Sequence, residues 1–271
     1  MFDQKIVVSE MLDVLLLSYK QQTSTMFLGA SGVGKSATIE TFANTIAPNQ
    51  PNNLIDIRLC MKSIEQVGGV LMPKELPNGS FVLQTALPEE YECLFDPSYK
   101  GVLLFDEFTS TLPSLQNVMY QVALDRILGG RKISDGVAVC MFGNLHTNGG
   151  KTYNILKPIL NRVKAYEIDS NSEAALEDWL NTFAYHSNIH PAFIGFLEQN
   201  PSLLNTNDVD NKPNQPFMSG RSIEAASKDL YAIEQGEISE RLGWISINGL
   251  LNESHAADFK KYYRIGIILN E

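Results

Sequence analysis

The sequence predicts an α/β fold in which a parallel sheet flanked by helices is followed by a smaller, all-helical domain. Two observations lead to it. Short apolar strands alternate with helical patterns up to about residue 169, and helical patterns dominate from there to residue 271. Alternation of this kind is typical of a parallel sheet covered by helices. We therefore expect a core at residues 1–169, with a β-hairpin insert near 68–87, and a helical domain at residues 170–271.

The core strands are expected where short apolar runs are bounded by polar residues or turns. Residues 53–59 alternate apolar and polar side chains, so this strand should be half-buried and near a sheet edge. The other runs are more uniformly apolar, as strands inside a parallel sheet are. They lie at residues 24–28, 101–105, 137–142 and 164–168.

Helices are expected between these strands, where apolar residues recur every three or four positions. In the core they fall near residues 11–16, 36–46, 114–128 and 156–162, and Pro48 ends the second of them. In the second domain they fall at residues 173–185, 192–199, 222–234 and 237–242. A loop rich in Asn and Pro is expected at residues 205–216.

The insert is predicted by Asn78-Gly79, which lies between the runs 70–74 and 80–86. Asn-Gly flanked by strand-like segments is a strong hairpin signal, because both residues accept the positive φ of a tight turn. An ordinary edge hairpin and a specialised insert are both compatible with this pattern.

Composition limits the function classes. The 271 residues carry a formal net charge of -10, which argues against broad neutralisation of duplex DNA. The apolar runs are too short to cross a bilayer, so we expect no membrane segment. The three cysteines and four histidines are scattered, which predicts no zinc site and reduced, buried thiols. We expect a cytoplasmic protein.

A phosphate-binding loop is predicted after the first of the apolar strands. Residues 29–36 match the pattern G-x-x-x-x-G-K-[ST], with a strand before the loop and a helix after it. Backbone N–H groups would surround a phosphate, Lys35 would add a positive charge, and the Ser36 hydroxyl would bind Mg²⁺. The expected nucleotide-binding residues are Gly29, Ala30, Ser31, Gly32, Val33, Gly34, Lys35 and Ser36.

An acid pair is predicted at the end of the strand 101–105. Asp106 is expected to hold the Mg²⁺, and Glu107 to orient and polarise the attacking water. The pair turns a prediction of ATP binding into one of ATP hydrolysis. A second glycine-rich segment, residues 149–152, lacks the first glycine of the pattern and is interpreted as a turn.

From about Met11 to Leu230 the chain resembles AAA+ ATPases of the MoxR-like, dynein-related branch found in bacteria and phages. Asn144, after the strand 137–142, matches the family's sensor 1 position, although an Asn there can also form a local turn. The segment Pro158-Ile159-Leu160-Asn161-Arg162 resembles the family's LLNRF segment, and Ser219-Gly220-Arg221-Ser222-Ile223-Glu224 resembles its PRSWE stretch.

The resemblance implies roles for two arginines. Arg162 would be an arginine finger that reaches the nucleotide of a neighbouring subunit, and Arg221 would be sensor 2. Without the resemblance, Arg162 is a surface charge and Arg221 a residue that caps or solvates its helix. The chain departs from the family at Ser31, Leu145 and Val163, none of which removes a catalytic group.

The resemblance further implies a Mg-dependent ATPase that forms a homo-oligomeric ring, commonly a hexamer, and remodels or activates a protein partner. Partners of the von Willebrand factor A or metallopeptidase-like type are implied in the same way, and the hairpin would face the pore or a partner. The alternative is an AAA+ factor that acts on nucleic acid in helicase loading, replication or packaging, which steeply salt-dependent DNA binding would support. A kinase or GTPase is disfavoured, since no [NT]KxD-type motif follows the core.

Overall fold

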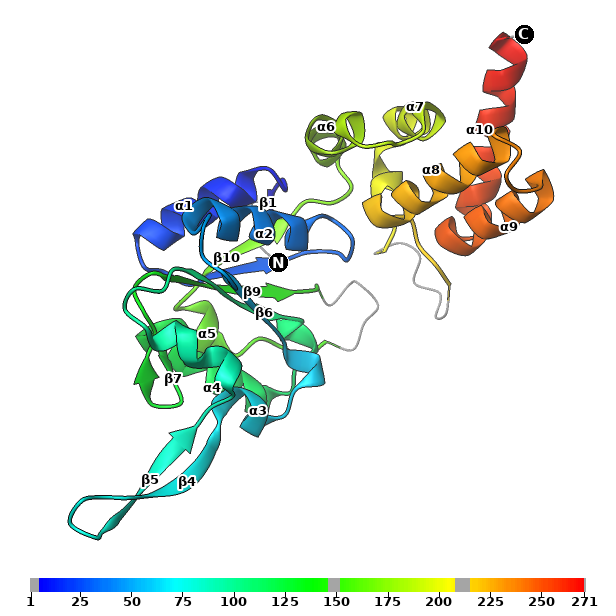
Figure 1. The fold of residues 1–271 in the computed structure, drawn as a ribbon. Coiled ribbons are helices and arrows are strands. Elements are labelled where there is room, and N and C mark those ends of the chain that lie inside the picture. The colour runs from blue at the N-terminus through cyan, green and yellow to red at the C-terminus, as the bar shows by residue number, and fades with distance from the viewer. Residues whose placement is uncertain (1–4, 146–151, 208–214, 271) are drawn as a thin grey trace.

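The computed structural model describes residues 5–145, 152–207 and 215–270. Figure 1 shows two bodies, an α/β core and a helical region, joined by the segment between β10 and α6. A two-stranded hairpin projects from the core on the side away from the helical region. This is the fold class that the sequence predicts.

The core is built on a six-stranded sheet in the order β1-β10-β2-β9-β6-β3, and every neighbouring pair is parallel. Five of its strands were expected, and the alternating strand β3 lies at the edge as predicted. The short strand β1 was not expected. The strands are β1 (Lys5–Ile6), β2 (Thr25–Leu28), β3 (Leu54–Arg58), β6 (Gly101–Asp106), β9 (Val137–Gly143) and β10 (Lys164–Ile168).

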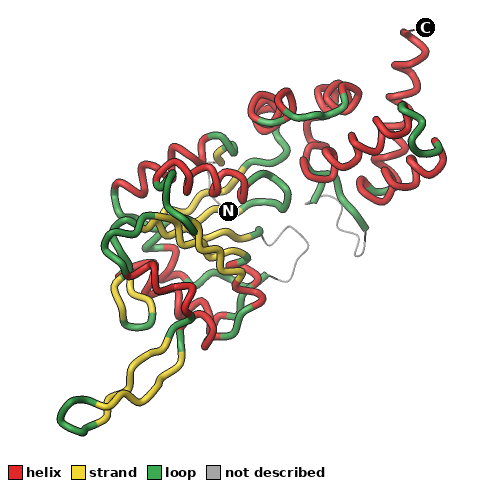
Figure 2. The backbone as a smooth tube through the Cα atoms, in the orientation of Figure 1, coloured by secondary structure: helices red, strands yellow, loops and turns green. Residues whose placement is uncertain are grey.

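Helices cover both faces of the sheet, as Figures 1 and 2 show. One face packs on α1 (Glu10–Lys20) and α2 (Lys35–Ile46), which bury side chains such as Leu15 and Phe42. The other face packs on α3 (Ile64–Gly68) and α4 (Pro113–Asp125), with the single turn α5 (Lys157–Leu160) beside α4.

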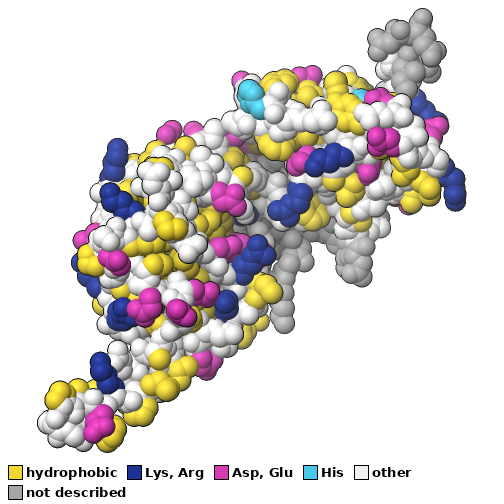
Figure 3. Space-filling model, viewed as in Figure 1, with side chains coloured by type: hydrophobic (Ala, Val, Ile, Leu, Met, Phe, Trp, Pro, Cys, Tyr) yellow, Lys and Arg dark blue, Asp and Glu magenta, His cyan; other side chains and the backbone are white. Residues whose placement is uncertain are grey.

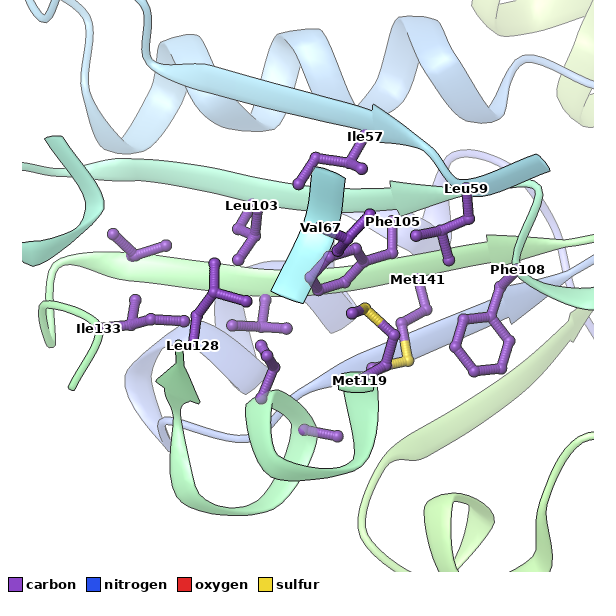
Figure 4. Packing of buried hydrophobic residues seen from close by; sticks show 14 of the residues in the cluster. Ile57, Leu59, Val67, Leu103, Phe105, Phe108, Met119, Leu128, Ile133 and Met141 are labelled. Atoms are coloured by element: carbon purple, nitrogen blue, oxygen red, sulfur yellow. The ribbon is translucent and has the colours of Figure 1, made fainter. Parts of the chain in front are cut away.

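Strand β6 illustrates how the period of two divides the core. Leu103 and Phe105 point to the α4 face, where they pack with Met119 and Met141 (Figure 4). Val102 and Leu104 point to the opposite face. Both faces of β6 are buried, and the strand is uniformly apolar until Asp106. The polar Asp106 marks the carboxyl end of the strand, at the edge of the sheet.

The C-terminal end of the predicted helix 114–128 is wrong. Helix α4 stops at Asp125 because Arg126 adopts a left-handed conformation, with a φ of 55°. Residues 127 and 128 instead form β7 (Ile127–Leu128), which pairs with β8 (Arg131–Lys132). Gly129 and Gly130 both have positive φ, as a two-residue hairpin turn requires.

A hairpin is present at the position of the predicted insert, formed by β4 (Val70–Glu75) and β5 (Phe81–Ala86). Gly79 in its turn has a φ of 78°. Large apolar side chains on both strands are exposed, and Figure 3 shows them along the projecting arm. They include Val70, Leu71, Met72, Phe81 and Leu83.

The region after β10 is helical and has its own hydrophobic core, which includes Phe193, Leu230 and Phe259. Its helices are α6 (Glu173–Thr182), α7 (Pro191–Gln199), α8 (Gly220–Glu234), α9 (Glu240–Leu251) and α10 (Glu253–Asn270). The predicted helix 237–242 was misplaced, since Ser239 caps a helix that starts at Glu240, and α10 was not expected. Short 3-10 turns occur at Leu59–Met61, Glu89–Phe95, Phe108–Ser110, Ala184–His186 and Pro201–Leu204.

The structure bears on two features expected from the composition, the membrane segments and the cysteines. No helix in the described part of the chain is long and apolar enough to span a membrane. The prediction that all three cysteines are buried was wrong, because Cys60 is exposed, Cys93 is half-buried and only Cys140 is buried.

Candidate functional site

The glycine-rich loop connects the buried end of β2 to the start of α2. Gly32 and Gly34 have φ of 79° and 104°, a left-handed region that residues with a Cβ rarely adopt. Gly34 caps the helix, so Lys35 and Ser36 form its first turn. The Gly29 N–H donates to the Gly143 carbonyl at 3.1 Å, which fixes the loop against β9. The loop thus presents helix N–H groups at the carboxyl edge of the sheet, where anions bind favourably.

Lys35 lies across this loop. Its Nζ donates to the carbonyls of Gly29 at 2.7 Å and Ala30 at 2.9 Å. Desolvation lowers the pKa of Lys35 from 10.5 to about 8, although the charges of Asp106 and Glu107 oppose the shift. Arg221 lowers it further, so the structure brings all four charges together. An anion in the cleft would favour the charged form of Lys35.

The acid pair lies at the end of β6, next to the loop. Glu107 has a left-handed φ of 56°, which is unusual for a residue with a side chain. Asp106 Oδ1 accepts from the Glu107 N–H at 2.8 Å, and Glu107 Oε2 accepts from the Ser110 hydroxyl at 3.2 Å. Each carboxylate is therefore held by a hydrogen bond from within the turn.

Asn144 follows the next strand, β9, and its side chain points to the acid pair. Its Nδ2 lies 3.5 Å from Glu107 Oε2, a long hydrogen bond. An amide and a carboxylate this close can both hydrogen-bond to one water molecule that lies to the side of the pair. The Asn144 amide therefore lies beside the Glu107 carboxylate.

A cleft of about 820 Å³ runs over these residues between the core and the helical region. Figure 3 shows the surface hollowed between the two bodies. Gly29 and Ala30 lie beneath it, with Ala30 only 2% exposed. The predicted site residues that line the cleft are Ser31, Gly32, Val33, Gly34, Lys35, Ser36, Asp106, Glu107, Asn144 and Arg221.

The donor set of this cleft suits Mg²⁺. Ser36 offers a hydroxyl and Asp106 a carboxylate, and both line the cleft beside the helix N-terminus. Mg²⁺ commonly takes one or two protein oxygens and completes its shell with water and substrate phosphates. Among the described residues no group of three or more His, Cys, Asp or Glu forms a metal cage.

The helical region contacts the loop directly. Arg221 is in the first turn of α8, and Ser219 lies so close to Gly32 that a Cβ on Gly32 would come within 3.0 Å of it. Asn205, which is 3% exposed, donates from Nδ2 to the Ser31 carbonyl at 3.1 Å. Asn205 was missed because an Asn in a loop rich in Asn carries no distinguishing pattern.

Arg162 lies apart from the other predicted site residues. Its Nη1 donates to the Pro158 carbonyl at 3.1 Å, and its guanidinium lies 4.5 Å from the centre of the Tyr120 ring. The described residues that line the cleft do not include it. The glycine-rich segment 149–152, interpreted as a turn, falls largely outside the described residues, since only Thr152 is described.

The fold and the site together define the class: an α/β protein with a phosphate-loop motif after β2 and an acid pair at the end of β6, two parallel strands that lie on either side of β9. No protein family model matches the chain, and no curated protein matches it. The chain is similar in structure to a presumed ATPase from Cytophaga hutchinsonii, with 13% identity and a TM-score of 0.42. That match covers 66% of this chain and 52% of the other.

The chain is also similar to Hsp104. The match to the Saccharomyces cerevisiae Hsp104 complex with ADP has 18% identity, a TM-score of 0.48, and covers 84% of this chain and 45% of Hsp104. The match to closed Hsp104 with ATPγS and FITC casein has 17% identity, the same TM-score, and covers 83% and 44%. The chain thus spans about half of each of these proteins, and likenesses this distant carry no argument about activity.

Proposed function

We propose that this chain is a Mg-dependent ATPase of the AAA+ type, which resembles the MoxR-like branch and hydrolyses ATP to ADP and phosphate. One observation carries the proposal. Lys35, Glu107, Asn144 and Arg221 come from four separate elements and line one cleft at the carboxyl edge of the sheet. Phosphoryl transfer needs such a set, because it depends on positioning and charge stabilisation more than on covalent chemistry.

In this proposal the loop binds the phosphates. The N–H groups at the start of α2 and the Lys35 ammonium face the cleft and neutralise phosphate charge. Ser36 and Asp106 hold the Mg²⁺, which, when bound, neutralises charge on the phosphate oxygens. Arg221 approaches from α8, so a phosphate in the cleft connects the core with the helical region.

Glu107 and Asn144 are assigned to the attacking water. Glu107 Oε2 accepts a hydrogen bond from water and draws its proton, while the Asn144 amide holds the same water in line. The left-handed backbone of Glu107 supports this assignment, since strained residues concentrate at functional sites.

The site as assigned is completed by a neighbouring copy. We assign Arg162 as an arginine finger acting in trans, in a homo-oligomeric ring, with a hexamer as the expected size. Its position outside its own cleft is what this role requires. A protein partner, of the von Willebrand factor A or metallopeptidase-like type, and a cytoplasmic location complete the proposal and rest on the resemblance alone.

The finger role predicts complementation between two inactive variants. A mixture of Arg162→Ala and Glu107→Gln chains should regain ATP turnover, because about a quarter of the interfaces in randomly mixed rings pair an intact Glu107 with an intact Arg162. The measurement is phosphate release per chain against the mixing ratio.

The matched control replaces the Glu107→Gln chain with one that also carries Arg162→Ala. That mixture contains no finger and should stay inactive. If the first mixture forms rings and gains no activity over its components, Arg162 does not act in trans.

The lowered pKa of Lys35 predicts a pH dependence of nucleotide binding. In the protein without nucleotide, Lys35 loses its proton near pH 8, whereas a bound polyphosphate favours the charged form of Lys35. Affinity for Mg-ATP should therefore be flat below pH 8 and fall above it, approaching about tenfold per pH unit. The dissociation constant is measured by titration between pH 6.5 and 9.5. Lys35→Arg stays charged throughout and should bind with a flat profile, so a flat wild-type profile contradicts the assignment.

A further inference from the structure

We propose that Thr109 is a positioning residue for hydrolysis, which sets Asn144 relative to Glu107. The inference rests on the proposed ATPase function and adds a residue that the AAA+ resemblance does not assign. Thr109 follows the acid pair by two positions, in the turn Phe108–Ser110. Its side chain is 3% exposed, so it contacts no substrate directly.

Thr109 joins the ends of two neighbouring strands through its hydroxyl. Its Oγ1 accepts from the Asn144 N–H at 2.8 Å and donates to the Asn144 carbonyl at 2.9 Å. Both backbone groups of Asn144 are therefore fixed by one side chain from the turn that carries Glu107. The Thr109 carbonyl also accepts from the Tyr153 N–H at 2.6 Å.

The methyl group of Thr109 adds a packing contact. A Cβ built on Gly143 would lie 2.7 Å from Thr109 Cγ2, so glycine is needed before Asn144 for the two strand ends to approach this closely. Hydroxyl and methyl thus have separable tasks: the first fixes the backbone of Asn144, and the second fills the space over Gly143.

The consequence is a defined separation between the two groups assigned to the water. Asn144 Nδ2 lies 3.5 Å from Glu107 Oε2 while its backbone is held by Thr109. Glu107 is held on its own side by the Ser110 hydroxyl, and its carbonyl accepts from the Thr111 hydroxyl at 3.0 Å. Loss of the Thr109 hydroxyl leaves Glu107 in place and releases Asn144. The proposed role is therefore specific to the Asn144 side of the site.

The test compares Thr109→Val, which keeps the shape and the methyl, with Thr109→Ser, which keeps the hydroxyl. For Thr109→Val we expect kcat to fall roughly 10- to 100-fold, as for a misplaced catalytic group. The dissociation constant of Mg-ATP should stay within about twofold, because the loop at residues 29–36 is untouched. Thr109→Ser should recover most of kcat. Melting temperatures of both variants report whether the fold is intact.

A double variant locates the effect. With Asn144→Ala already present, adding Thr109→Val should lower kcat little further, since the positioned side chain is gone. Full additivity would overturn the route through Asn144. Equal losses in Thr109→Val and Thr109→Ser, or a loss of binding as large as the loss of kcat, would overturn the positioning role. An unchanged kcat in Thr109→Val would also overturn the positioning role. In that case an active wild-type protein would still support the proposed ATPase function. A wild type that binds Mg-ATP without turnover would overturn both.

Discussion

Replacing Glu107 with Gln should abolish ATP turnover while nucleotide binding is kept. The substitution preserves shape, and the amide can still accept from the Ser110 hydroxyl that holds Glu107 Oε2. What is lost is the ability to draw a proton from water, which is worth roughly 100- to 10,000-fold in rate. We expect kcat to fall by that factor and the dissociation constant of Mg-ATP to change by less than about threefold.

Single-turnover and equilibrium-binding measurements on the same preparation separate the two effects. Glu92→Gln is a matched control, because Glu92 pairs with Arg131 on the core surface and does not line the cleft. It should behave as the wild type. A Glu107→Gln chain that turns over ATP normally would remove Glu107 from the mechanism.

Replacing Lys35 with Met should remove nucleotide binding without weakening the fold. The Lys35 ammonium is desolvated, which lowers its pKa to about 8. Charge-assisted contacts to phosphate of this kind are worth about 3 kcal/mol or more, so affinity for Mg-ATP should fall at least about 100-fold. A Met side chain fills similar space and carries no charge to desolvate.

The lowered pKa of Lys35 also determines how the charge of this side chain affects the free energy of folding. Burial lowers the folded pKa below the unfolded value of 10.5, so the folded state binds the Lys35 proton more weakly. At neutral pH, below both values, this opposes folding in full, and the opposition disappears between about pH 8 and 10.5. Met removes this opposition and also the Nζ hydrogen bonds to the Gly29 and Ala30 carbonyls, so the melting temperature of Lys35→Met without nucleotide should stay close to that of the wild type. A marked drop would mean that lost binding reflects unfolding.

The parts of the fold with a local cause could be predicted from the sequence. Leu103 and Phe105 are apolar because both faces of β6 are covered, and Asp106 is polar because the sheet ends there. Asn78-Gly79 predicted the hairpin because the turn itself needs positive φ. Gly129-Gly130 carries the same turn signal. The apolar residues before it follow a helical spacing, so the sequence-based prediction ended helix α4 three residues too late.

The parts missed depend on contacts between distant segments. Strand β1 has two residues and exists because it pairs with β10, more than 150 positions away. Asn205 contacts Ser31 through a bond that spans 174 positions, and Thr109 contacts Asn144 across 35. A hydroxyl or amide that completes such a contact follows no periodic sequence pattern, so these residues can be identified only from the folded structure.

Hydrolysis of ATP in the cleft over residues 29–36 is measured as phosphate release from Mg-ATP over a series of protein concentrations. We expect turnover that requires Mg²⁺, rises per chain as subunits associate, and disappears in Lys35→Met and Glu107→Gln. Turnover that persists in Lys35→Met, or its absence in a wild-type protein that is assembled and binds Mg-ATP, would contradict the proposed ATPase function.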